Sequence, residues 1–144
     1  MTRFLLDVNV LIALIDPSHV QHDRAHLWFE KQGKKAWASC PLTENGVLRI
    51  VGHARYPNSP GTPAAVAELM QRFLGHPGHE FWADDISLLD RRYVDGGRLL
   101  DSGQVTDSYL LALATARGGK LATFDRQLVT DAVVNGSRSL HLIQ

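Results

Sequence analysis

Short apolar runs alternate along this chain with longer segments in which apolar residues recur at helical spacing. The first run, residues 4–6, ends on Asp7, and a helical pattern then begins at once and continues to residue 15. The run predicts a buried strand, and the following segment predicts a helix packed after it. Asp7 would then lie at a strand-to-helix junction, the place where ligands bind in open α/β sheets.

The same alternation continues to the end of the chain. It predicts strands at residues 36–40, 80–83, 120–123 and 140–143, helices at residues 20–31, 44–54, 63–74 and 105–117, and shorter helices at residues 87–93 and 125–130. Strands that alternate with helices, without hairpin signals, indicate a mostly parallel sheet covered on both faces. We therefore expect a single α/β domain over residues 1–144, with a central sheet of about five strands.

Four acidic residues occupy similar places in this pattern. Asp7, Glu44 and Asp125 follow predicted strands, and Asp107 lies just inside the start of a helix. Apolar residues stand three, four and seven positions after Glu44 and after Asp107, so each acid heads the apolar stripe of its helix and is expected to point inward. An inward carboxylate needs a partner, because burying an unpaired charge is costly.

Each acid alone is well explained as a helix cap, because Asp and Glu complement the helix dipole. The four together suggest a shared site. The carboxyl ends of parallel strands lie along one edge of a sheet, and carboxylates gathered there raise one another's pKa unless a cation neutralises them. An all-oxygen site suits Mg²⁺ or Mn²⁺, which can orient water and stabilise a phosphate undergoing displacement. Metal-dependent hydrolysis of phosphodiesters follows as a hypothesis.

Small polar residues accompany the acids. Thr106 directly precedes Asp107, and as an ordinary residue it would be a helix N-cap. Asn9 and Thr123 each lie two positions from an acid. In a metal site, Asn9 and Thr123 would hold water or the scissile phosphate.

The chain closely resembles the PIN-domain ribonucleases, in motifs that have the same order and spacing. These motifs are LDVNVL at residues 6–11, TE at 43–44, TDSYLLALA at 106–114 and ATFD at 122–125. The resemblance runs from the first strand to the last. It is greatest to the VapC toxins of bacterial toxin–antitoxin pairs, in the branch common in mycobacteria. Asn9 is a departure, since many PIN domains carry Ser or Thr there, but Asn keeps a polar oxygen.

The resemblance implies a PIN-like three-layer α/β/α sandwich and a metal-dependent endoribonuclease. Asp7 and Asp107 would be the principal ligands of Mg²⁺ or Mn²⁺. Glu44 would support the metal directly or through water, Asp125 would complete the set, and Thr123 would assist Asp125. The substrate would be tRNA, rRNA or mRNA, and its cleavage would inhibit translation and growth. The resemblance also implies a homodimer and a cognate DNA-binding, VapB-type antitoxin whose C-terminal segment crosses the active-site groove.

The charge of the chain bears on how it could bind RNA. The formal net charge is zero, from 15 basic and 15 acidic residues, so the chain lacks the strongly basic character of many nucleic-acid-binding domains. Four acids gathered around a metal would leave the remaining surface mildly basic. Arg55 and Arg117 are candidate contacts for RNA phosphates or for the antitoxin, or else solvated cations favoured at helix C-termini.

The sequence also bears on location. It contains no apolar run long enough to cross a membrane and no basic leader before a long apolar stretch. Cys40 is the one cysteine, which rules out an internal disulfide and favours a small buried residue near a strand end. We therefore expect a cytoplasmic protein.

Three histidines share one face of the predicted second helix. His19, His22 and His26 are spaced at i, i+3 and i+7. That spacing could bind a metal, but without a further ligand a polar face near the groove is the favoured interpretation.

Two other functions compete with the ribonuclease hypothesis. A phosphatase with Asp7 as nucleophile would be expected to carry a second Asp where Asn9 stands and a Lys near Asp107, and the sequence has neither. A non-catalytic RNA-binding or regulatory domain of the same fold need not keep four acids. Both features favour the ribonuclease.

Overall fold

A parallel five-stranded sheet forms the centre of the molecule in a computed structural model that describes all 144 residues. The strands are β1 (Phe4–Leu6), β2 (Trp37–Ser39), β3 (His79–Phe81), β4 (Lys120–Thr123) and β5 (Leu140–Leu142). Their spatial order is β3-β2-β1-β4-β5, and every neighbouring pair is parallel. The predicted sheet is thus confirmed, with β1 in the middle and the sequence order changing direction on either side of it.

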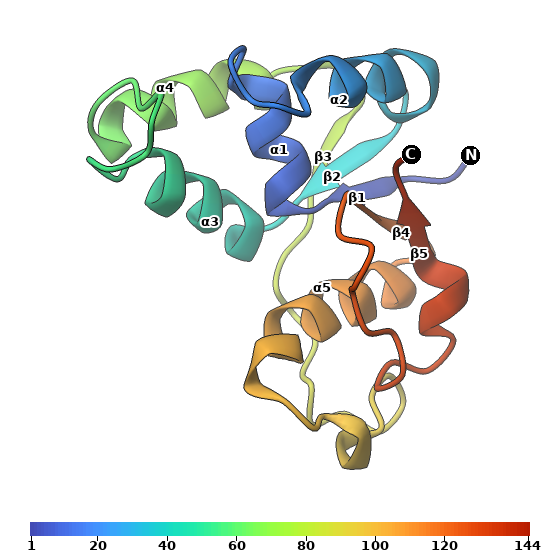
Figure 1. The fold of residues 1–144 in the computed structure, drawn as a ribbon. Helices are drawn as coiled ribbons and strands as arrows, with labels where there is room; N and C mark the ends of the chain where they lie inside the picture. Colours follow the sequence, from blue (N-terminus) through green and yellow to red (C-terminus); the bar gives the residue numbers. More distant parts are fainter.

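Helices cover both faces of the sheet, so the three-layer α/β/α arrangement is also confirmed. The helices are α1 (Val8–Ile15), α2 (His22–Trp28), α3 (Pro41–Val51), α4 (Pro63–Leu74) and α5 (Val105–Ala116). Figure 1 shows α1 to α4 gathered on one side of the sheet and α5 alone on the other. A short π-helix (Phe29–Gly33) extends α2, and 3₁₀ turns occur at Gly96–Arg98, Ser102–Gln104 and Gly136–Ser139.

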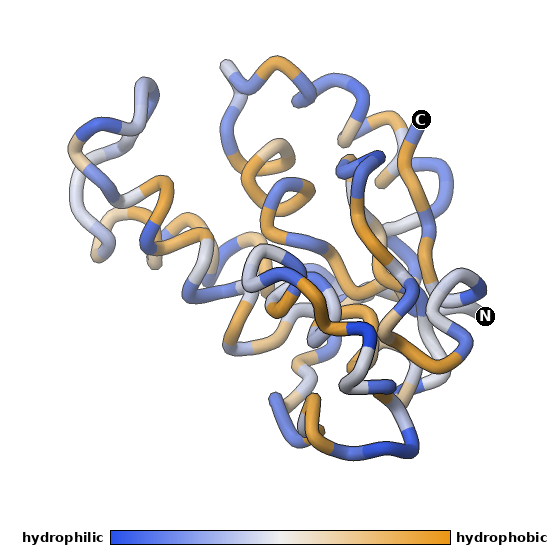
Figure 2. The backbone as a smooth tube through the Cα atoms, turned by 60° about the horizontal axis from the view of Figure 1, so that its bottom comes forward, coloured by the Kyte–Doolittle hydropathy of each residue, from blue (hydrophilic) through white to orange (hydrophobic).

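Alternate residues of a strand pack into opposite halves of the hydrophobic core. In β1, Phe4 and Leu6 pack into the cluster beneath α1 to α4, whereas Leu5 packs into the cluster against α5. The neighbouring strand β2 divides in the same way, with Trp37 on the first side and Ala38 on the second. Successive side chains of a strand point to opposite faces, so a short apolar run between two helical layers is buried on both sides. Figure 2 shows the apolar and polar stretches alternating along the backbone.

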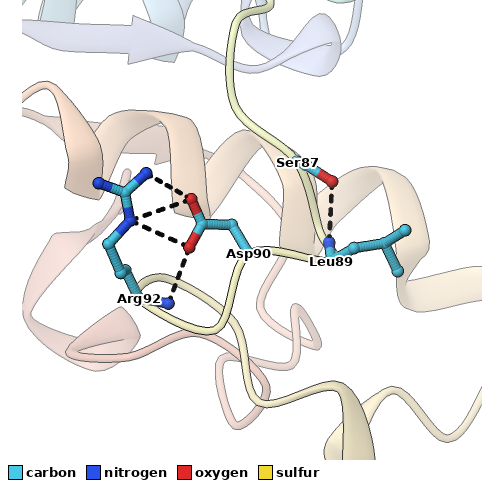
Figure 3. Close-up of polar contacts among 4 residues, drawn as sticks. All are labelled: Ser87, Leu89, Asp90 and Arg92. Carbon is cyan, nitrogen blue, oxygen red and sulfur yellow. Dashed lines mark hydrogen bonds and ion pairs between the residues drawn. The ribbon is translucent and has the colours of Figure 1, made fainter.

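The helix predicted at residues 87–93 is not formed. Ser87 Oγ accepts a hydrogen bond from the backbone N–H of Leu89 (3.0 Å), and Asp90 Oδ1 accepts one from the backbone N–H of Arg92 (2.9 Å), as Figure 3 shows. Asp90 also forms an ion pair with Arg92 at 2.7 Å. These side chains satisfy backbone groups that a helix would otherwise pair, so the segment folds as consecutive turns.

The short helix predicted at residues 125–130 is also absent, for the same reason. Asp125 Oδ1 accepts a hydrogen bond from the backbone N–H of Gln127 (2.9 Å), which closes a turn directly after β4. The helix predicted at residues 20–31 is formed in part. It begins at His22 and passes into the π-helix that ends at Gly33.

The structure also shows the environment of Cys40 and the character of the helices. Cys40 is fully buried between β2 and α3, as expected, and burial raises the pKa of its thiol to about 11. None of the helices has both the length and the apolar character needed to span a membrane.

Candidate active site

Three of the four predicted acids meet at the carboxyl edge of the sheet. Asp7, Asp107 and Asp125 line one open pocket of about 370 Å³. The other residues that line this pocket are Val8, Asn9, Ile12, His19, Ile50 and Tyr56. The parallel topology explains the meeting, because β1 and β4 are neighbours and both end at this edge. The pocket contains no Lys or Arg, so its charge is strongly negative.

Asp7 is the most deeply placed acid of the pocket. It caps the N-terminus of α1, where its Oδ1 accepts a hydrogen bond of 2.7 Å from the backbone N–H of Val8. Its side chain is nevertheless only 7% exposed. Asp7 therefore caps α1 and lines the pocket at once, since one carboxylate oxygen accepts from the helix and the other accepts from Thr123.

Thr123 organises the hydrogen bonds around Asp7. Its Oγ1 donates to Asp7 Oδ2 at 2.8 Å and accepts from the side-chain amide of Asn9 (3.1 Å) and from the backbone N–H of Asp125 (3.1 Å). Asn9 Oδ1 in turn accepts from the backbone N–H of Phe124 (3.2 Å), and its amide reaches Asp7 at 3.4 Å. Asn9 and Thr123 therefore lie beside the acids, and their hydrogen bonds fix the orientation of Asp7.

The carboxylates disfavour one another's charged forms. Burial raises the pKa of Asp107 to about 6, and the negative charges of Asp7 and Asp125 add to the shift. Burial also raises the pKa of Asp7, against the opposing effect of its hydrogen bonds from Thr123 and Val8, and Asp125 raises it further. An anionic pocket without a cationic side chain is a site in which a bound cation would be strongly favoured.

Glu44 is separate from these three acids. It lies in the first turn of α3, but it does not line the pocket. Its Oε2 accepts a hydrogen bond of 2.6 Å from Ser39 Oγ at the end of β2, and the same hydroxyl lies 2.7 Å from His79 Nε2. Ser39 is fully buried, so the structure holds Glu44 at the edge of the sheet through a chain of polar contacts. No motif or spacing pointed to the contacts of Ser39 and His79.

The remaining predicted residues lie outside the pocket. Thr106 is exposed in the first turn of α5, and it does not cap that helix, whose N-cap is Gln104. Arg55 lies in an exposed turn after the end of α3 rather than on the helix. Arg117 caps the far end of α5, where its guanidinium pairs with Asp85 at 3.0 Å.

The three histidines do not form a metal site. His22 Nδ1 lies 2.7 Å from the carbonyl of Ala13, and His26 Nε2 lies 2.9 Å from the carbonyl of Leu14. These rings satisfy free carbonyl groups at the C-terminal end of α1. His19 precedes α2 and is the one histidine that lines the acidic pocket, so the metal interpretation of the trio is wrong.

A second buried acid supports the pocket wall. Asp16 accepts hydrogen bonds from the hydroxyl of Tyr56 and from the backbone N–H of Ser18 (2.9 Å). Burial alone would raise the pKa of Asp16, but these hydrogen bonds outweigh burial and lower it, and His19 contributes in the same direction. Burial and the contact with Asp16 raise the pKa of Tyr56. Sequence reasoning missed this pair, because the two residues lie 40 positions apart in the chain.

The chemistry of the pocket fits Mg²⁺ or Mn²⁺. Carboxylate and amide oxygens make up most of its ligand groups and suit these ions, and His19 is the one nitrogen ligand that lines it. No three His, Cys, Asp or Glu side chains are grouped closely enough to form a complete protein cage. Mg²⁺ does not require such a cage, because it retains several waters and uses one or two carboxylates together with substrate phosphates.

Comparison with known proteins identifies the family. The model of the PIN domain matches residues 4–131. The chain belongs to the PIN-domain family. Within the family it is a VapC-type protein, as its identity to relatives shows. It is 46% identical over 140 residues to Ribonuclease VapC44 of Mycobacterium tuberculosis, an alignment that covers 97% of each chain.

Solved PIN-domain structures share the fold. The crystal structure of Mycobacterium tuberculosis VapC20, described as a sarcin-ricin loop cleaving toxin, matches with a TM-score of 0.61 at 11% identity, over 91% of this chain and 96% of that one. VapBC2 from Rickettsia felis, bound to a DNA fragment from its promoter, matches with a TM-score of 0.58 at 11% identity, over 99% of this chain and 100% of that one. At such low identity these likenesses support the fold alone.

Proposed function

We propose that this VapC-type chain is a metal-dependent endoribonuclease and the toxin of a VapBC toxin–antitoxin pair. The observation that carries the proposal is the meeting of Asp7, Asp107 and Asp125 in one open pocket that is lined by no Lys or Arg. The relatives named ribonucleases support it, because they are aligned along nearly the whole chain.

Residues in and beside the pocket have different roles in the proposed hydrolysis. Asp7 and Asp107 would hold Mg²⁺ or Mn²⁺, Glu44 would support the metal from outside the pocket, and Asp125 would complete the set at a second metal or by positioning water. A bound Mg²⁺ or Mn²⁺ supplies positive charge beside the phosphate and the water that attacks it. Thr123 and Asn9 keep the Asp7 carboxylate in one orientation, which reduces the rearrangement needed when substrate arrives.

The attack by water forms a new bond to phosphorus while the bond from phosphorus to the leaving ribose oxygen breaks. An open pocket at a sheet edge suits this reaction on a large substrate, because an RNA strand can cross the edge without entering a closed cavity. The substrate class we propose is tRNA, rRNA or mRNA, and its cleavage would inhibit translation and growth.

We further propose that a VapB-type antitoxin controls the activity and that the chain forms a homodimer. The 46% identity to Ribonuclease VapC44 supports such a partner, because it makes the chain VapC-type. A C-terminal segment of the antitoxin lying across the pocket would bring a basic group to the carboxylates and exclude RNA. Addition of the cognate antitoxin to the purified protein should therefore abolish cleavage, and light scattering should give twice the mass of one chain.

Expression in a bacterial host tests the toxin function. Induction of the wild-type chain should arrest growth and produce new RNA ends at a small number of positions, whereas Asp7→Asn, expressed to the same level, should do neither. Sequencing of RNA 5′ ends from both cultures would identify the target. Growth arrest without new RNA ends, or equal arrest by the variant, would contradict the proposal.

A further inference from the structure

The acidic pocket has few groups that could bind an anionic substrate directly. Its polar side chains are Asp7, Asn9, His19, Tyr56, Asp107 and Asp125. The carboxylates repel phosphate, and a metal between them would compensate for the scissile phosphate only. The neighbouring phosphates of an RNA strand also carry charge, so they need hydrogen-bond donors from the protein at the same edge.

Most of the donors in the pocket are already engaged. The hydroxyl of Tyr56 donates to Asp16. The side-chain amide of Asn9 is directed to Thr123 and Asp7, at 3.1 and 3.4 Å. These groups would have to break internal hydrogen bonds before they could bind phosphate, which leaves His19 as the side chain with a free N–H.

The local structure determines which nitrogen of His19 is free. The backbone N–H of Gln21 donates to His19 Nδ1 at 3.0 Å. Nδ1 is therefore the acceptor, so the N–H of this ring lies on Nε2. His22 and His26 instead contact the carbonyl groups at the end of α1, so neither has the same freedom.

We propose that His19 forms a second phosphate-binding position at this pocket, which takes a phosphate of the RNA strand next to the one that is cleaved. The proposal rests on the proposed ribonuclease function. His19 belongs to a neighbouring position because it lies in the turn before α2, whereas Asp7 and Asp125 follow β1 and β4 and Asp107 lies in the first turn of α5.

The chain offers a matched control for this residue. His53 Nδ1 accepts a hydrogen bond of 3.0 Å from the backbone N–H of Arg55, so His53 makes the same local turn as His19. His53 is exposed and does not line the pocket. Loss of the turn contact is thus common to His19→Leu and His53→Leu, and only the first variant also loses a donor at the pocket.

The test measures binding and cleavage of an RNA oligonucleotide that contains the mapped cleavage site. Binding is measured by fluorescence anisotropy in the Asp107→Asn background, which cannot cleave. His19→Leu should weaken binding about tenfold, the loss expected for one hydrogen bond to a charged group. His19→Gln, which retains an N–H donor, should restore most of the affinity, and His53→Leu should bind like its parent. In the active protein, His19→Leu should raise KM and leave kcat nearly unchanged.

Nuclear magnetic resonance of the imidazole nitrogens measures RNA binding at His19 independently of cleavage activity. The Nε2 signal of His19 should move on addition of the same RNA, while that of His53 should not. If wild-type protein cleaves RNA but His19→Leu binds and cleaves like wild type, the proposal that His19 binds a phosphate is wrong and the ribonuclease function stands. If no RNA is cleaved but binding still depends on His19, the phosphate position stands and the ribonuclease function is wrong.

Discussion

Thr123 donates a hydrogen bond of 2.8 Å from its hydroxyl to Asp7, and this contact joins the carboxyl ends of the neighbouring strands β1 and β4. Both residues are buried. The same hydroxyl accepts from Asn9 and from the backbone N–H of Asp125. Through one oxygen atom, Thr123 therefore orients the deepest carboxylate and places the start of the Asp125 turn.

Thr123→Val should weaken both the fold and the site. The substitution preserves the shape of the side chain but removes the 2.8 Å donor of Asp7 and the acceptor that Asn9 and the Asp125 N–H share. We expect the free energy of unfolding to fall by about 1–3 kcal/mol and RNA cleavage to fall by about 10- to 100-fold. Chemical denaturation and cleavage assays measure the two effects. Thr123→Ser keeps the hydroxyl and is the control; equal losses in both variants would show that the hydroxyl is unimportant.

Asp107 should make the metal-free protein less stable at neutral pH than in mild acid. Its pKa is about 6 in the folded chain and 3.8 in the unfolded reference, so the folded form takes up the proton first as the pH falls. As the pH falls, the free energy of unfolding therefore increases around pH 6, and this increase levels off below pH 4. Thermal unfolding in EDTA between pH 5 and 8 measures this trend. Asp107→Asn should remove this component of the trend, and identical pH profiles for the two proteins would refute the assignment.

Glu44→Gln should separate the charge of this residue from its hydrogen bond. The amide oxygen of Gln can still accept from Ser39, so we expect thermal stability to stay close to that of wild type. Loss of the negative charge should lower RNA cleavage by about tenfold or more if Glu44 supports the metal. Cleavage at several Mg²⁺ concentrations gives the measurement. Unchanged cleavage and unchanged Mg²⁺ dependence would leave Glu44 with a structural role only.

Gly118→Ala should destabilise the chain through the backbone alone. Gly118 ends α5 with a φ of 70°, and the space around its Cβ position is open, so no side-chain clash contributes. We expect a loss of about 1 kcal/mol in the free energy of unfolding, because non-glycine residues are disfavoured at positive φ. Denaturation of Gly96→Ala, whose Cβ position is also open but whose φ is not positive, provides the comparison. Equal losses would mean that the backbone angle is not the cause.

Much of the fold follows from the sequence because its signals are local. Residues 4–6 form a short apolar run and residues 120–123 a short segment between helical patterns, and both became strands of the sheet. Parallel pairing then brings Asp7 and Asp125 to one edge without any further information. The two helices wrongly predicted after β3 and β4 show the limit. Ser87, Asp90 and Asp125 bind nearby backbone N–H groups, and hydrophobic spacing does not reveal that competition.

The contacts that complete the site depend on distant parts of the chain. Asn9 meets Thr123 across 114 positions, and Ser39 meets His79 across 40. The chain reversal before α2 turns His19 toward the pocket, whereas helical spacing placed it with His22 and His26. Residue types and spacing therefore indicated the acids, but the polar residues around them required the tertiary structure.

The most direct test of the account is cleavage of total cellular RNA by the purified protein in Mg²⁺ or Mn²⁺. The account predicts a few discrete fragments that disappear with EDTA and with folded Asp7→Asn, because both remove the same centre. Fragments that persist in EDTA, or an Asp7→Asn variant with full activity, would contradict the assignment of Asp7, Asp107 and Asp125 as the metal-dependent site.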